Sequence, residues 1–185
     1  ETMSTADLLR LENLLVKAGL WEEAETLLVE LGVRSPDVPD VYFALGNLYR
    51  DTGRLSQAVA AFARATTLDP MFLPAKNNLA VIYGSQGDFE RSNRYLHEVL
   101  DWDPDNSRAL GNLGLNLYLQ GQISEGVEML ERAVESDSSA VQPRLNLARI
   151  YLQKREVRRA VILCRQVVDL DPGNAQAREL IRQYG

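Results

Sequence analysis

One feature restricts the fold of this chain more than any other: the same kinds of residue return every 34 positions. Prolines stand on this spacing at Pro36, Pro70, Pro104 and Pro172. Four more rows share the register, namely the turn glycines Gly19, Gly53, Gly87 and Gly121; the apolar Leu11, Leu45, Leu79, Leu113 and Leu147; the small Ala24, Ala58, Ser92, Gly126 and Ala160; and the bulky Trp21, Leu55, Phe89, Ile123 and Val157. A shared period in five rows indicates an array of one repeated unit.

Each period has room for two helices. In the second period Val41, Leu45 and Leu48 form an apolar stripe at helical spacing, and a second stripe follows the glycine Gly53. A period of this length, with a glycine between two helical stretches, predicts a helix–turn–helix unit that stacks on its neighbours. The small residues at one place on each helix let the paired helices approach closely.

The rows resemble the tetratricopeptide repeat (TPR) family. The second unit matches most fully, through Tyr42, Leu45-Gly46, Tyr49, Gly53, Ala58, Phe62, Ala65 and Pro70. The resemblance implies an all-α fold, a right-handed α-solenoid of antiparallel helix pairs, running as a single array over residues 1–185. We expect units at about 5–38, 39–72, 73–106, 107–140 and 141–174, and a capping helix over 175–185.

Turn residues explain where the helices stop. Glycine adopts the left-handed conformation at a helix C-terminus, and proline disfavours helix in the residue before it, so each Asp-Pro or Ser-Pro ends a second helix at a fixed place. Two positions depart from the pattern. Ser138 replaces the closing proline, which predicts a softer stop, and Arg155 replaces the turn glycine.

Residues for chemistry are scarce. The chain has one histidine, His97, and one cysteine, Cys164, whose apolar neighbours indicate a buried residue. No glycine-rich phosphate loop and no metal-ligand spacing is present, so we expect no enzyme activity, cofactor or metal. The net charge of −6 argues against nucleic-acid binding, and no stretch approaches the roughly 20 apolar residues of a membrane span.

If the first helix of each unit lines the concave side, as the resemblance implies, its non-core residues form a groove. We expect the peptide-binding residues to be Phe43, Asn47, Asn77, Asn78, Val81, Arg108, Asn112, Leu115, Tyr118, Leu145, Asn146 and Arg149. The first unit adds Leu9, Arg10 and Asn13. This mixture of amides and apolar side chains suits an extended or helical segment with apolar anchors.

Asn78, Asn112 and Asn146 form a row in this groove, 34 residues apart. The row resembles the asparagine ladder of some TPR grooves, in which amides pair with the backbone of an extended ligand; equally, it can reflect ancestry alone. We expect these amides to be partly exposed and Leu79, Leu113 and Leu147 beside them to be buried. The carboxylate clamp of TPR co-chaperones is matched at Asn47, Asn78 and Arg108, but Phe43 and Asn112 replace its basic residues, which disfavours that mode.

Charge is distributed unevenly. The first unit carries a net charge of about −4 and the fifth about +4. We therefore expect a non-enzymatic module that binds a protein or peptide partner in its groove. The alternative is a structural scaffold that self-assembles or spaces other domains, with the groove empty or filled by its own chain. The basic end would attract an acidic partner or the acidic end of another copy.

Overall fold

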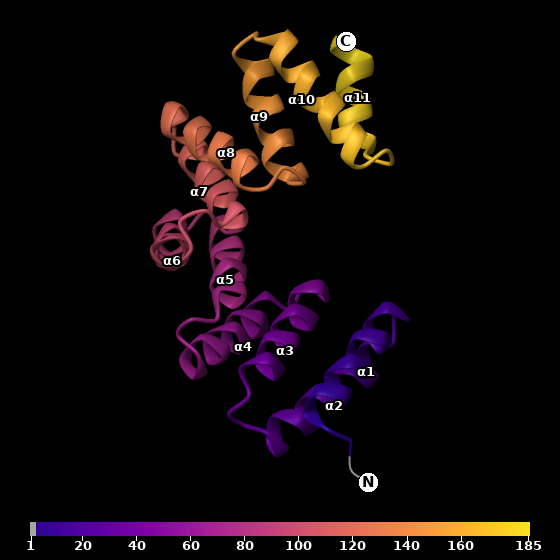
Figure 1. The fold of residues 1–185 in the computed structure, drawn as a ribbon. Coiled ribbons are helices and arrows are strands. Elements are labelled where there is room, and N and C mark those ends of the chain that lie inside the picture. The colour runs from indigo at the N-terminus through magenta and orange to yellow at the C-terminus, as the bar shows by residue number, and fades with distance from the viewer. Residues whose placement is uncertain (1–2) are drawn as a thin grey trace. The chain divides into compact units, whose positions relative to one another are not determined.

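A computed structural model describes residues 3–185, and within them every regular element is an α-helix (Figure 1). The helices are α1 (Thr5–Lys17), α2 (Trp21–Arg34), α3 (Pro39–Asp51), α4 (Leu55–Leu68), α5 (Leu73–Ser85), α6 (Phe89–Trp102), α7 (Ser107–Leu119), α8 (Ile123–Ser136), α9 (Val141–Gln153), α10 (Val157–Leu170) and α11 (Ala175–Tyr184). The prediction of an all-α fold is confirmed. None of the helices in the described part is long and apolar enough to cross a membrane.

The odd-numbered helices start at regular intervals. Their first residues are Thr5, Pro39, Leu73, Ser107, Val141 and Ala175, each 34 positions after the last. We call α1, α3, α5, α7 and α9 first helices, and the helix that follows each of them a second helix. Every first helix has 13 residues and every second helix has 14, so the predicted helix pairs at a 34-residue step are confirmed.

The turn between paired helices requires a left-handed residue. Gly19, Gly53, Gly87 and Gly121 have φ between 76° and 85°, as expected of glycine at this place. In the fifth pair Arg155 adopts the same conformation, with φ 61°, and is the only non-glycine residue of 3–185 with positive φ. The turn keeps its geometry without glycine, at the cost of a strained arginine.

The predicted soft stop at Ser138 is wrong, because α8 ends at Ser136 with the same length as the other second helices. Asp137 accepts hydrogen bonds from the backbone N–H and the hydroxyl of Ser139, at 2.8 and 2.6 Å. The backbone bond is also present in two turns that contain proline, from Met71 to Asp69 and from Gly173 to Asp171. The guanidinium of Arg144, which is 7% exposed, donates to the carbonyls of Ser138 (2.9 Å) and Ala140.

Contacts between Cα atoms divide the chain into two compact units, Glu1–Gln86 and Gly87–Gly185. The first unit has a core of buried leucines from α1, α2 and α3, among them Leu28, Leu31, Leu45 and Leu48. The core of the second unit joins α8, α9, α10 and α11 through Leu130, Leu147, Ile150, Val167 and Ala177. Each unit therefore has its own hydrophobic core.

Close packing inside a pair depends on glycine in two places. A Cβ atom on Gly114 of α7 would lie 2.8 Å from the carbonyl oxygen of Gly126 in α8. A Cβ on Gly46 of α3 would lie 2.5 Å from the ring of Phe62 in α4. Both distances are too short for any larger residue, so the small rows set the separation of the paired helices.

The last helix covers the end of the second core. Ala177 of α11 is fully buried, and Leu180 and Ile181 pack against the cluster formed by α9 and α10. Its N-terminus is capped by Asn174, whose side-chain oxygen accepts from the N–H of Ala177 at 3.0 Å. The predicted capping contacts are confirmed.

Candidate functional site on the first helices

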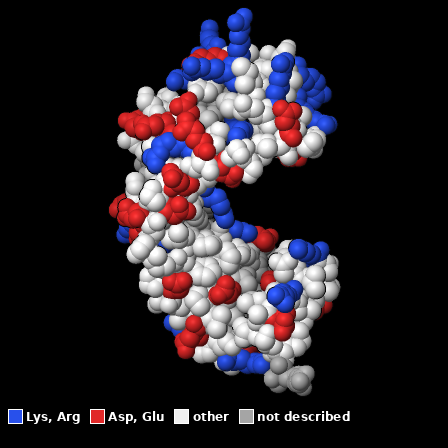
Figure 2. Space-filling model, in the orientation of Figure 1, with Lys and Arg blue, Asp and Glu red and all other residues white. Residues whose placement is uncertain are grey.

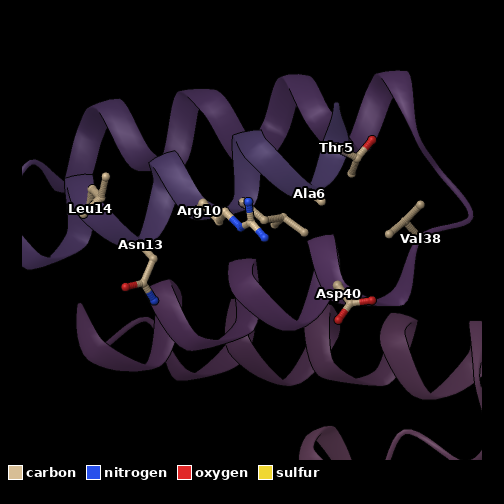
Figure 3. Close-up of a pocket in the computed structure, with 8 residues that line it drawn as sticks. Thr5, Ala6, Arg10, Asn13, Leu14, Val38 and Asp40 are labelled. Atoms are coloured by element: carbon tan, nitrogen blue, oxygen red, sulfur yellow. The ribbon is translucent and has the colours of Figure 1, made fainter. Parts of the chain in front are cut away.

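The first unit has a cavity between α1 and α3, with a volume of about 780 Å³. It contains the three residues expected to line the groove in the first pair, Leu9, Arg10 and Asn13, and five others: Thr5, Ala6, Leu14, Val38 and Asp40. Figure 3 shows the side chain of Arg10 reaching from α1 into the space between the two helices, with Asp40 on the opposite side. The cavity combines an apolar lining with one cation, one anion and one amide.

Phe43 on α3 is a packing residue as well as a surface residue. Its ring centroid lies 5.8 Å from that of Phe62 and 5.3 Å from that of Phe72, both in tilted arrangements, and its side chain is only partly exposed. This aromatic group fixes one wall of the first-helix face and leaves part of an apolar surface for a ligand.

The amides of the first unit are closely packed. Asn78 of α5 donates from Nδ2 to Oδ1 of Asn47 on α3 at 2.9 Å. Asn77 and Asn78 are each 3% exposed, whereas Val81, one turn further on, is 40% exposed. The expectation of a partly exposed Asn78 is therefore wrong: the helix beside it is near enough for the two amides to bond each other.

The second unit shows the same difference. Asn146 of α9 is 5% exposed and accepts from Gln142 at 3.2 Å, and Leu145 is 3% exposed. Partial exposure was wrongly expected of Asn146 too, because its side chain is buried and bonded to Gln142 on the same helix. Asn112 of α7 is partly exposed, as expected. The predicted burial of Leu79, Leu113 and Leu147 is confirmed, with exposures of 0%, 3% and 2%.

The remaining expected residues of the second unit lie at the surface. Leu115 and Tyr118 of α7 are partly exposed, and Arg108 and Arg149 are exposed. The hydroxyl of Tyr118 donates to Gln153 on α9, and the Arg149 guanidinium donates to the side-chain oxygen of Gln176 on α11. The side chains thus connect α7, α9 and α11 into one surface.

Three of the five first helices carry no acidic residue. The sequences of α5, α7 and α9 contain no Asp or Glu, whereas α8 alone contains Glu125, Glu128, Glu131 and Glu135, all exposed. The acidic groups of this net-negative chain are thus concentrated outside these three first helices. An anionic ligand meets less repulsion there than on the second helices.

Residues suited to catalysis or metal binding do not come together. His97 is exposed on α6, and Cys164 of α10 is 1% exposed, with burial raising the pKa of its thiol. Residues 3–185 contain no group of three or more His, Cys, Asp or Glu side chains placed to hold a metal ion.

Sequence patterns missed the contacts that join consecutive pairs. Tyr151 of α9 donates to Glu131 of α8 at 2.7 Å, and the guanidinium of Arg159 on α10 lies 5.4 Å from the centre of its ring. Burial and the bond to Glu131 raise the pKa of Tyr151 to about 12. These residues line a second cavity of about 420 Å³ between α8 and α10. Tyr151 shares a 34-residue row with Tyr49 and Tyr83, but its partners Glu131 and Arg159 stand in none of the rows described above, so the period did not reveal these contacts.

Stacked helix pairs with tight small-residue contacts and an amide-bearing first-helix face define a helical-repeat protein of the solenoid class. Comparison with known families identifies it further: the tetratricopeptide repeat family matches residues 9–70, 85–142 and 117–184. The chain belongs to the tetratricopeptide repeat family, and its members serve as protein–protein interaction scaffolds.

Curated relatives come from distant organisms. Protein NPGR2 of Arabidopsis thaliana is 30% identical over 130 residues, covering 67% of this chain and 18% of that protein. Type IV pilus assembly protein PilF of Pseudomonas aeruginosa is 28% identical over 119 residues, covering 63% and 47%. Protein O-mannosyl-transferase TMTC3 of Homo sapiens is 30% identical over 120 residues, covering 64% and 13%. The chain spans less than half the length of each.

Solved structures share the fold. Pseudomonas aeruginosa PilF superimposes with a TM-score of 0.81 at 18% identity, covering 97% of this chain and 87% of that one. YrrB, described as a TPR protein with an unusual peptide-binding site, superimposes with a TM-score of 0.65 at 16% identity, covering 95% and 90%. At these identities the likeness concerns the fold alone.

Proposed function

We propose that this chain is a non-enzymatic binding module that holds an extended or helical segment of a partner protein against its first helices. The observation that carries the proposal is the cavity of about 780 Å³ between α1 and α3, lined by the expected Leu9, Arg10 and Asn13. An apolar lining with a few polar groups is typical of peptide-recognition surfaces. The peptide-binding site of YrrB, a protein of the same fold, supports this assignment.

In this proposal the five helix pairs and α11 belong to one array over residues 1–185, and both units contribute surface residues to binding. The surface of the first unit offers Arg10, Phe43 and Val81, and that of the second offers Asn112, Leu115 and Tyr118. The partly exposed Asn112 is the amide best placed to pair with a ligand backbone, because Asn78 and Asn146 are already packed in helix contacts.

Capture of partners from a lysate, followed by mass spectrometry, tests the proposal when paired with surface variants. Asn13→Arg in α1 and Val81→Arg in α5 place bulky charges on the first-helix face of the first unit. His97→Arg, exposed on the second helix α6, is the matched control. We expect both first-helix variants, but not the control, to lose the captured partner. Equal capture by all three would assign the binding to another surface.

A scaffold that associates with itself is the second candidate, supported by the charge distribution. Residues 141–185 contain nine Lys or Arg and four Asp or Glu, in a chain of net charge −6. Figure 2 shows the basic side chains gathered over α9 to α11. Sedimentation at low and high salt tests this candidate, since exposed charges are screened beyond about 8 Å at physiological ionic strength. A monomer under both conditions would exclude it.

A further inference from the structure

The outer side of the first helix pair leaves apolar residues uncovered at places that are buried everywhere else. Leu11 of α1 is 37% exposed, whereas Leu45, Leu79, Leu113 and Leu147, in the same row, are 7%, 0%, 3% and 2% exposed. Leu14 is 62% exposed, whereas Leu48, Ile82, Asn116 and Ile150 are between 1% and 6% exposed. Leu11 and Leu14 therefore stand at positions that are buried in the other four pairs but exposed in this one.

The repeat itself shows what covers this row. Leu45 and Leu48 of α3 are buried in one cluster with Leu28 and Leu31 of α2, the second helix of the preceding pair. In the second unit Leu147 and Ile150 of α9 share a cluster with Leu130 of α8, again the preceding second helix. A helix with apolar residues three positions apart is thus the element that fits over Leu11 and Leu14.

The α2 side of this face is acidic. Glu23, Leu27 and Glu30 stand in the register of Arg159, Leu163 and Gln166, which line the cavity of α10 that faces α8. Arg64 and Arg132 stand in the same 34-residue row as Glu30. Their guanidinium groups donate hydrogen bonds to the carbonyl oxygens of Pro36 and Pro104, in the preceding pair. By comparison with these rows, the exposed Glu23 and Glu30 lie on the side of α2 that a preceding helix pair would contact. Leu11 and Leu14 lie on the corresponding side of α1.

The α1 side also carries an acid. Asp7 is exposed and stands in the row of Val41, Ala75, Ala109 and Pro143, all buried. A helix placed over Leu11 and Leu14 would meet the carboxylates of Asp7, Glu23 and Glu30. Asp7 already has the guanidinium of Arg10 at 3.4 Å, so the need for added cations comes mainly from Glu23 and Glu30. Burying an acid without a cation beside it is unfavourable, so the covering helix must bring basic side chains at its margins.

We propose that Asp7, Leu11, Leu14, Glu23, Leu27 and Glu30 form a docking face for an amphipathic helix with basic margins, supplied by a partner. Leu14 also lines the cavity between α1 and α3, whereas the other five residues of the face do not. The docking face does not depend on the function proposed above. The expected partner segment shares the apolar spacing of this chain's second helices, with apolar residues at positions i and i+3, and like α10 it carries basic residues beside them.

Two helices of the chain supply matched probes. A peptide of residues 156–171, with Cys164 replaced by Ala to keep an apolar residue at that position, has the apolar pattern with Arg158, Arg159 and Arg165. A peptide of residues 122–137 has the same register with Glu125, Glu128, Glu131 and Glu135. Both need a covalent helix-stabilising crosslink, because isolated helices of this length are marginal in water. Fluorescence anisotropy of the labelled peptides measures their binding to the full chain.

We expect the basic peptide to bind at least about tenfold more tightly than the acidic one, and the preference to shrink with added salt. Leu11→Gln with Leu14→Gln should weaken its binding at least about tenfold. Leu119→Gln, a matched control 56% exposed on α7, should leave binding unchanged. Thermal melting of each variant establishes that it folds.

Three results would overturn the proposal. They are equal binding of the two peptides, undiminished binding to the double leucine variant, or self-association of the chain that the same two substitutions abolish. The last result would assign the face to a second copy of the chain.

Discussion

Arg54 and Glu25 are joined by two parallel hydrogen bonds across consecutive helix pairs, from Nη1 to Oε1 at 2.9 Å and from Nη2 to Oε2 at 2.8 Å. The guanidinium also lies 4.5 Å from the centre of the Tyr49 ring. The hydrogen bond from Arg54 is the main reason that the pKa of Glu25 is lowered. One ion pair thus ties α2, α3 and the start of α4 together.

The pH dependence of this contact follows from the direction of the shift. A carboxyl whose pKa is lower in the folded state stabilises the fold above its unfolded pKa, near 4.3 for Glu, and loses that effect as the pH falls through the folded pKa. Glu25→Gln should therefore lower the melting temperature at pH 7 and have little effect at about pH 3. Glu128→Gln, exposed on α8, is the control. A constant difference for Glu25→Gln from pH 7 to pH 3 would contradict this account.

Glycine substitutions should have opposite effects at two helical sites. Gly114→Ala places a Cβ 2.8 Å from both the Gly126 carbonyl oxygen and Leu130 Cγ, and overpacking of this kind costs about 1–3 kcal/mol. Gly32→Ala in α2 meets nothing within 4 Å and should stabilise the fold by up to about 1 kcal/mol, because alanine is the better helix former. Chemical denaturation of both variants measures the difference. Equal effects would show that α7 and α8 can separate.

The strained turn of the fifth pair makes Arg155→Gly a stabilising substitution. An L-residue in the left-handed conformation costs about 1–2 kcal/mol, which glycine avoids. Against this stands the greater freedom of glycine in the unfolded chain, so we expect a net gain of about 1 kcal/mol or less. Lys154→Gly, beside it with φ −76°, should instead destabilise. Urea unfolding followed by circular dichroism compares the two.

The period predicted the helices, their turns and the buried leucine row because each of these depends on residues near one another in the sequence. It could not predict how far a neighbouring helix covers a given side chain. Asn78 and Asn112 occupy the same row, yet one is 3% exposed and the other is partly exposed. Contacts such as Arg54 with Glu25 join residues that lie off every row, and only the packed helices reveal them.

Alanine substitutions in the asparagine row should have different effects on stability, depending on how deeply each amide is buried. Asn78→Ala removes a buried amide that is bonded to Asn47 and should cost about 1 kcal/mol or more of stability. Asn112→Ala, at a partly exposed position, should change stability by less than about 0.5 kcal/mol. Denaturant titration ranks the two variants. For a captured partner the order reverses: Asn112→Ala should weaken binding by about 0.5–1.5 kcal/mol, measured by calorimetric titration.

Removal of the last helix should expose the end of the second core. Deleting residues 175–185 uncovers the partners of Ala177, Leu180 and Ile181 on α9 and α10. Repeat arrays depend on such end helices because an open end leaves apolar surface in water. We expect a lower melting temperature and reduced solubility, measured by calorimetry and by light scattering. Deleting only Gln183 to Gly185, all exposed, is the control and should change little.

Replacing Leu180 and Ile181 by Gln in the full chain separates loss of apolar contact from loss of the helix, because the backbone and the Asn174 cap remain. If these two substitutions leave the melting temperature unchanged while the deletion lowers it, the cap acts through its backbone and Ala177 rather than through its apolar side chains.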